Sequence, residues 1–282
     1  MNFGVYFFGA EWNIDPLELG REAEARGFDF LLVPEHTHIP VSRQTPYPGG
    51  PGPLPAEFSH TPDPFVLLAA VAAVTKTLQV GTGVSLIIER HPITQAKVIA
   101  TLDDLSGGRV LFGIGAGWNR EEMENHGTPY DRRWRVMREH IEAMQAIWTQ
   151  DEASYDGEFV KFEKIWCWPK PKQKPYPPIL VGGNQEGALR RVVRFGDEWM
   201  PSNTAGIQDM EGKFKQLQEL AAAAGRGPIP GGVFNCEHDA AQVERYIKLG
   251  LHRFCFMLPH TGRDDVLRKL DELKGWIDPL RG

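Results

Sequence analysis

Cysteine is scarce in this 282-residue sequence, which has three cysteines (Cys167, Cys236 and Cys255) and no CxxC pair. This excludes a disulfide scaffold and a cysteine-rich zinc site, and it favours a reducing cytoplasm. No apolar run approaches the ~18 residues of a membrane span, and MNFGVYFFGAEW at the start lacks the features of a signal peptide. We therefore expect a cytoplasmic protein without a membrane-embedded part.

An excess of positive charge is also missing, because 31 Lys and Arg stand against 37 Asp and Glu, a net charge of −6. A broad basic face for nucleic acid or anionic lipid is therefore excluded. Hydrophobic residues make up 41% and charged residues 24%, which is ordinary for a globular protein with a large core. The length fits one α/β barrel of about 250 residues with insertions.

Short apolar runs that end in glycine or proline alternate with amphipathic segments along the chain. Their continuous apolar character favours a parallel sheet covered on both faces. The sequence thus predicts the α/β class and a (β/α)8 TIM barrel. The alternative is an open doubly wound sheet, which the lack of GxGxxG at the first turn disfavours. The eight expected strands are residues 3–8, 28–33, 78–83, 109–115, 179–182, 198–200, 232–235 and 253–258.

Two stretches interrupt this alternation. Residues 34–62, after the second strand, contain eight prolines and three glycines. Residues 151–178 follow the fourth strand and its long helix, and they include a Tyr-Asp-Gly-Glu sequence typical of a hairpin turn. Stretches this long without regular structure are usually functional. We interpret both as insertions in a single domain that spans residues 1–282.

Glu35 and His36 directly follow the second strand, on the face that carries the active site in barrels. A carboxylate beside an imidazole is a plausible acid–base site, since histidine titrates near neutral pH. The alternatives are loop residues paired with backbone, or a zinc site built on His36 and His38. The other histidines do not repeat the paired spacing, so we predict no metal.

Glycines gather at three expected strand ends. Gly81 and Gly83 end the third strand, Gly113, Gly115 and Gly117 the fourth, and Gly182 and Gly183 the fifth. Each group fits a tight turn, but three of them at one face predict a shared pocket where a ligand approaches the backbone. Trp12, Trp118 and Trp199 also follow strand ends. Their side chains would either pack in the core or form a wall against a flat ring.

Residues 81–122 carry a specific order of motifs, RHP…AK…ATLDDLSGGR…GxGxGW. PEH follows the second strand, and VGGNQEGALRRVVRFGDEWMP begins in the fifth. Together these segments resemble the bacterial-luciferase-like superfamily, in particular its branch dependent on the deazaflavin coenzyme F420. The likeness covers nearly the whole chain, and it too implies a (β/α)8 barrel with insertions.

The resemblance implies that a flavin or deazaflavin lies across the strand C-termini. A non-proline cis peptide at Gly83–Val84 would back the ring, and Glu35 and His36 would be the family's acid–histidine pair. The cofactor phosphate would lie at Gly182, Gly183 and Ser202. We also expect Gly115, Gly117 and Asn184 in the cofactor site, and Trp12, His38, Trp118, Glu121 and Trp199 in the substrate pocket.

Two departures from the pattern disfavour sugar-phosphate oxidation. Trp118 stands where F420-dependent sugar-phosphate dehydrogenases carry a glutamate, and Thr204 and Ala205 stand where they carry a lysine. Coenzyme F420 has an anionic oligoglutamate tail, whose carboxylates need cations nearby in the protein. Arg43, Arg90 and Lys97 are our candidates for these cations. We interpret residues 132–135 (Arg-Arg-Trp-Arg) as a solvated helix start, with tail binding as the alternative.

The resulting prediction is an F420-dependent oxidoreductase that acts on a small molecule, in which His36 handles the proton and Glu35 orients it. The alternatives are an FMN-dependent monooxygenase of the same superfamily and a non-catalytic flavin-binding protein. We also expect a homodimer.

Overall fold

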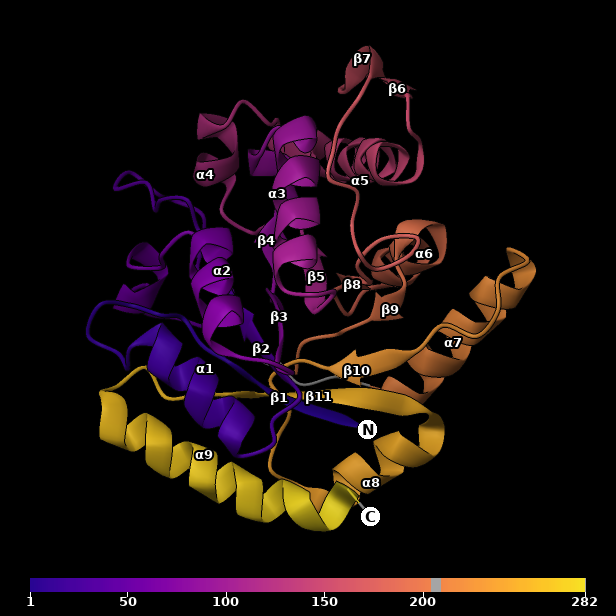
Figure 1. Ribbon diagram of the computed structural model, residues 1–282. Coiled ribbons are helices and arrows are strands. Elements are labelled where there is room, and N and C mark those ends of the chain that lie inside the picture. The colour runs from indigo at the N-terminus through magenta and orange to yellow at the C-terminus, as the bar shows by residue number, and fades with distance from the viewer. Residues whose placement is uncertain (204–208, 282) are drawn as a thin grey trace.

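The computed structural model, which describes residues 1–203 and 209–281, shows a closed barrel of parallel strands with helices outside it (Figure 1). The sheet runs β3-β2-β1-β11-β10-β9-β8-β5, and pairing of β3 with β5 closes it. This confirms the predicted (β/α)8 barrel. Its strands are β1 (Asn2–Tyr6), β2 (Phe30–Val33), β3 (Gln79–Thr82), β5 (Val110–Gly115), β8 (Ile179–Val181), β9 (Glu198–Trp199), β10 (Gly231–Val233) and β11 (Leu251–Met257).

The helices begin where local sequence signals place them. Asp15 and Asp63 each accept hydrogen bonds from two backbone N–H groups of the helix that follows, and each precedes a proline in the first turn. Gly250 ends α8 in the left-handed conformation, with φ of 101°. The α-helices are α1 (Pro16–Ala25), α2 (Pro64–Val74), α3 (Pro92–Leu105), α4 (Arg120–Asn125), α5 (Arg133–Thr149), α6 (Glu186–Phe195), α7 (Met210–Ala223), α8 (Ala240–Leu249) and α9 (Arg263–Ile277).

Both insertions lie where the sequence predicts them. Residues 34–62 follow β2 and contain a short 3₁₀ helix, Ala56–Ser59. Residues 151–178 hold the antiparallel pair β6 (Ala153–Asp156) and β7 (Lys161–Ile165), so the expected hairpin is present. Because residues 34–62 leave the C-terminal end of β2, they lie at the face where barrel active sites occur.

The third strand departs from its expected course, because it breaks at Gly83 and resumes as β4 (Ser85–Leu86), which pairs with β5. The backbones are very close here, since a Cβ at Gly113 would lie 1.9 Å from the Thr82 carbonyl oxygen. The Gly83–Val84 peptide is cis, as the resemblance implies.

Two apolar cores hold the fold together. The larger lies between strands and helices, and the smaller fills the lumen with side chains that include Tyr6, Phe30, Leu180 and Met200. At the N-terminal end of the lumen, Arg253 Nε donates to both carboxylate oxygens of Glu198, at 2.9 and 3.1 Å. The candidate functional site lies at the opposite, C-terminal end of the lumen.

Candidate functional site

A cavity of about 460 Å³ opens among the C-terminal ends of the strands. Its volume is within the range of sites for cofactors and drug-sized ligands. The walls are mostly apolar side chains and backbone. The side chains include Leu32, Val84, Ile114, Met137, Leu180, Met200 and Phe234, and the predicted residues among the lining are Gly83, Val84, Gly115, Gly117, Trp118, Gly182, Gly183 and Ser202.

The glycines of the cavity wall fit a flat ring held against backbone. A Cβ at Gly115 would lie 2.6 Å from Val84 Cγ2, and one at Gly83 would lie 2.9 Å from the Phe234 ring. A Cβ at Gly182 would meet nothing closer than 3.8 Å and would stand in the open cavity. Side chains at these positions would therefore crowd the wall or fill the cavity, so these residues suit a planar ring such as a flavin or deazaflavin.

Gly182, Gly183 and Ser202, which are predicted to hold the cofactor phosphate, line the same cavity, but Asn184 has a different place from the one expected. Gly183, with φ of 102°, turns the chain from β8 into α6. Asn184 does not line the cavity: its side-chain amide donates to the Ser202 carbonyl at 2.7 Å and accepts from Ser202 N at 3.1 Å. Lys213 of α7 donates its ammonium to the Asn184 carbonyl, which brings a cation that the sequence did not indicate to this turn. Thr204 and Ala205 lie outside the described residues.

His36 pairs with Glu122 and not with Glu35. His36 Nδ1 lies 2.7 Å from Glu122 Oε2, and the other oxygen of Glu122 accepts from Thr37 N at 3.0 Å. Both side chains are nearly excluded from solvent, at 6% and 1% exposure. A buried carboxylate on one ring nitrogen fixes the tautomer and leaves Nε2 for proton exchange.

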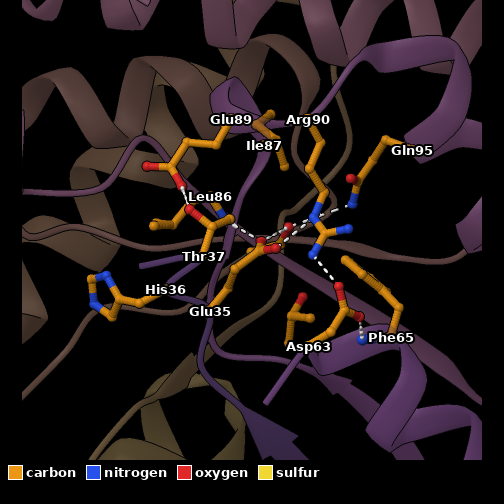
Figure 2. A network of polar contacts seen from close by, with 12 residues as sticks. Glu35, His36, Thr37, Asp63, Phe65, Leu86, Ile87, Glu89, Arg90 and Gln95 are labelled. Carbon is orange, nitrogen blue, oxygen red and sulfur yellow. Dashed lines mark hydrogen bonds and ion pairs between the residues drawn. The ribbon is translucent and has the colours of Figure 1, made fainter. Parts of the chain in front are cut away.

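Glu35 instead anchors the start of residues 34–62 to the break in the third strand. Its carboxylate accepts from Ser85 Oγ at 2.7 Å and Leu86 N at 2.8 Å, and it forms an ion pair with Arg90. Figure 2 shows the His36 ring pointing away from this carboxylate. The expectation that Glu35 orients His36 is therefore wrong, because alternate residues of an extended chain point to opposite sides.

A third buried carboxyl group, Glu89, lies near Thr37. Thr37 Oγ1 lies 3.5 Å from Glu89 Oε2 and 2.7 Å from His126 Nε2 (Figure 2 shows the first contact). Burial, and then the charge of Glu122, raises the pKa of Glu89 to about 9. Burial also lowers the pKa of His126. Both groups are therefore held mainly in their neutral forms at neutral pH.

Residues 34–62 cover one side of the cavity through aromatic contacts. The rings of Tyr47 and Phe58 lie with centroids 6.1 and 6.3 Å from that of Trp118, which lines the cavity. His36 is not a cavity-lining residue, but its ring centroid is 5.9 Å from Trp118 and 5.4 Å from Phe58. Trp118 thus separates the histidine from the cavity as the structure stands.

Four residues predicted in the substrate pocket do not line it. Glu121 accepts from Gln44 N, Thr45 N and Thr45 Oγ1, and these bonds outweigh desolvation and lower its pKa to about 2, so it anchors the loop. Trp199 is fully buried in the outer core and donates to the Gly183 carbonyl at 3.0 Å. Trp12 packs on His60 at the surface, and His38 bonds to Thr37 and Asn125.

Two of the three cations proposed for an anionic tail are engaged away from the cavity, since Arg90 forms ion pairs with Glu35 and Asp63 and Lys97 donates to the Trp168 carbonyl. Arg43 lies over the Trp118 ring and donates to the Thr45 carbonyl. Trp134 of α5 and Arg191 of α6 line the same cavity as Gly182, Gly183 and Ser202. Trp134 belongs to the Arg-Arg-Trp-Arg run, for which tail binding was the alternative interpretation, whereas sequence reasoning missed Arg191.

The chain matches the family model described as luciferase-like monooxygenase over residues 15–275. It is 43% identical to an uncharacterized protein of Mycobacterium tuberculosis over 277 residues, 97% of both chains. It is 31% identical to an FMNH(2)-dependent dimethylsulfone monooxygenase of Pseudomonas putida over 218 residues, which cover 76% of this chain and 55% of that protein. The chain therefore belongs to the luciferase-like monooxygenase family.

Solved structures with low sequence identity share the fold. Monooxygenase RslO1 from Streptomyces bottropensis superposes with a TM-score of 0.80 at 19% identity, covering 100% of both chains. An F420-dependent secondary alcohol dehydrogenase, in complex with an F420–acetone adduct, superposes with a TM-score of 0.76 at 18% identity and the same coverage. Proteins similar to this chain in sequence or in fold thus include an FMNH(2)-dependent and an F420-dependent one, and the fold does not distinguish them.

Two kinds of feature are absent from the described part of the chain. No three or more His, Cys, Asp or Glu side chains are grouped so that they could hold a metal ion. No helix there is long and apolar enough to cross a bilayer.

Proposed function

We propose that this protein is an oxidoreductase that transfers a hydride between coenzyme F420 and a small organic substrate at the C-terminal face of its barrel. The observation that carries the proposal is the 2.7 Å His36–Glu122 pair beside an apolar, glycine-walled cavity. A bound deazaflavin would supply two-electron hydride exchange at one ring carbon. The chain must then position the substrate and exchange one proton.

Each part of the site has a role in this proposal. Gly83, Gly115 and Gly182 let the ring lie against backbone, and the apolar walls exclude water. His36 exchanges the proton through Nε2, while Glu122 holds Nδ1 and stabilises the imidazolium. This requires that Trp118 move, or that the substrate reach past it, since Trp118 lies between His36 and the cavity.

The second candidate is an FMN-dependent monooxygenase with the same cavity and the same histidine. The observation that favours it is the 31% identity to the dimethylsulfone monooxygenase, whose name specifies FMNH(2). A small-molecule substrate is common to both candidates. The homodimer and the cytoplasmic location expected from the sequence stay predictions.

Calorimetric titration of the purified protein with F420 and with FMN tests the choice. We expect micromolar binding of F420 and weaker binding of FMN. A substrate panel then follows, read as loss of F420 fluorescence or absorbance. The reverse order of affinities would assign the protein to the FMN-dependent monooxygenases, and binding of neither cofactor would contradict both candidates.

A further inference from the structure

Arg191 of α6 lines the cavity without an acidic partner. Among the described residues it forms no ion pair, and its buried Nε has no hydrogen-bond partner. The arginines before and after it on the same helix differ, since Arg190 pairs with Glu186 at 2.7 Å and Arg194 pairs with Glu142 at 2.8 Å. Of these three arginines, Arg191 alone lines the cavity, and Arg191 alone lacks an acidic partner among the described residues.

A second unpaired arginine lies close by. Arg133, at the start of α5, donates to the Tyr130 carbonyl, but its buried Nε has no partner and it makes no ion pair with a described residue. Both guanidinium groups lie near the Trp134 ring, with Arg191 Cζ 3.7 Å and Arg133 Cζ 5.0 Å from its centroid. Arg133 Cζ also lies 3.8 Å from the centroid of the Tyr130 ring. Trp134 and Tyr130 thus hold two cations beside each other, where they repel.

The guanidinium of Arg191 lies over the first turn of α6. A Cβ added at Gly187 would be 3.3 Å from Arg191 Nη1. This is the helix that begins after Gly182 and Gly183, where free N–H groups and the helix dipole favour an anion. Burial, and then the charge of Arg133, lowers the pKa of Arg191, so a bound anion would relieve an unfavourable arrangement.

Arg191 lines the cavity, and Arg133 does not but lies beside it. In a chain of net charge −6, two neighbouring cations without acidic partners among the described residues, one of them in the cavity wall, are explained by a ligand more readily than by folding. Guanidinium groups bind phosphate and carboxylate oxygens through paired N–H donors. We propose that Arg191 and Arg133, held by Trp134, bind the anionic side chain of the cofactor where it leaves the cavity. This rests on the proposed function, and it replaces Arg43, Arg90 and Lys97 as the cations for that chain.

The test compares two double variants of equal charge change. Arg133→Gln/Arg191→Gln removes the proposed site, whereas Arg190→Gln/Arg194→Gln removes the paired surface arginines. Four ligands are titrated at low and high salt: F420, the same deazaflavin without phosphate and glutamates, FMN, and riboflavin. Arg191→Lys is a third variant, which keeps the positive charge but loses the paired N–H donors of the guanidinium group. Thermal unfolding checks that each variant folds.

We expect the Arg133/Arg191 variant to bind F420 about 10–100-fold more weakly, with a smaller salt dependence. The two uncharged ligands should bind as to the wild type, and the Arg190/Arg194 variant should bind all ligands normally. The F420 affinity of Arg191→Lys should lie between those of the Arg133/Arg191 and Arg190/Arg194 variants. An equal loss for FMN would assign the site to the phosphate, and a loss for F420 alone would assign it to the carboxylates. Equal weakening by the control variant, equal loss of the uncharged ligands, or no weakening would overturn the proposal.

Pyrophosphate makes the test independent of the cofactor's identity. We expect pyrophosphate to raise the unfolding temperature of the wild type and of the Arg190/Arg194 variant, but not of the Arg133/Arg191 variant. If neither F420 nor FMN binds the wild type, the proposed function fails while this shift still supports an anion site. If pyrophosphate gives no shift in that case, the anion site is overturned as well.

Discussion

Buried polar groups differ between the two ends of the barrel, because at the C-terminal end some are paired, as Glu35 and Glu122 are, and others are not. At the N-terminal end Arg253 is paired with Glu198, and the Arg109 guanidinium donates to the carbonyls of Ala72 and Leu78. At the C-terminal end, some buried side-chain atoms lack hydrogen-bond partners. Throughout the described chain, such atoms belong to residues in the loops or first two helical turns that follow strands: Asn13, Glu89, Gln95, Asn119, Arg133, Arg138, Arg191 and His260.

We infer from this difference that polar residues at the N-terminal end stabilise the barrel, whereas those at the C-terminal end include groups that a ligand can bind. A buried polar atom without a partner lowers stability, so its presence needs an explanation. In barrels the C-terminal face binds ligands and the N-terminal face contributes stability. We therefore expect substitutions at the C-terminal end to change turnover or affinity, and those at the N-terminal end to change the free energy of unfolding.

The largest effect is expected for His36→Ala. Removing the proton-exchanging ring should lower turnover by about 10²–10⁴-fold, with the unfolding temperature and cofactor affinity near those of the wild type. The matched control is His38→Ala, because His38 does not line the cavity, and it should keep turnover within about twofold. Steady-state kinetics on a substrate found in the panel makes the comparison. Unchanged turnover in His36→Ala would make His36 a loop residue only.

Arg253→Met tests the opposite end. It leaves Glu198 buried without its main partner, which should lower the free energy of unfolding by about 3–5 kcal/mol. Adding Glu198→Gln should recover part of this loss, since the unpaired charge is then removed. Urea unfolding measures the change, and cofactor affinity of the folded protein should stay the same. A large loss of affinity with little loss of stability would contradict the division between the two ends.

A pH effect is expected from Glu89, whose pKa burial raises to about 9. The unfolded chain releases this proton near pH ~4.3, so the folded state binds more protons between that pH and about 9. The contribution to stability is complete at low pH and is lost as the pH rises through this window. From about pH 6 to about pH 8 we expect a loss of about 2–3 kcal/mol relative to Glu89→Gln, because each pH unit in this window changes the free energy of unfolding by about 1.4 kcal/mol. Urea unfolding of both proteins at the two pH values checks this, and parallel curves would mean that Glu89 is ionised in the folded state.

The smallest effect on stability is expected for Glu121→Ala, which removes the anchor of residues 34–62 to α4. Glu121 is partly exposed, so the free energy of unfolding should fall by less than about 1 kcal/mol. The loop should nevertheless be cut faster by a protease, because the bonds to Gln44 and Thr45 are lost. Glu124→Ala is the control, since Glu124 pairs only with Arg120 at the surface. Equal cleavage rates in the two variants would show that Glu121 does not hold the loop.

Local signals in the sequence predicted local features well. The capping residues Asp15 and Asp63 and the hairpin at Asp156 are confirmed because each depends on neighbours a few residues away. The partner of His36 could not be predicted in this way. Glu122 is 86 residues distant, and only the orientation of α4 decides that Glu122, and not its neighbour Glu121, points to the histidine.

The ion-pair partners of the arginines on α6 could not all be predicted from nearby residues either. Arg190 pairs with Glu186 four residues earlier on α6, which the sequence could indicate. Arg194 pairs with Glu142 of α5 while Arg191 has no acid among the described residues, and this difference depends on how α6 packs on α5. The strand ends, by contrast, follow from glycine placement, so the location of the cavity could be predicted while the side chains around it could not.

The bonds between Asn184 and Ser202 have a consequence for how this site can vary. One amide side chain both donates to and accepts from the backbone of Ser202, which reproduces the paired bonding of a β-ladder beyond the last residues of β8 and β9. The sheet thus continues through a side chain at a point where the main chain has already turned outward. Strand spacing and turn conformation are set by different atoms here. The sequence of the turn could therefore change to suit another ligand while the barrel keeps its closure, provided that an asparagine stays at this position.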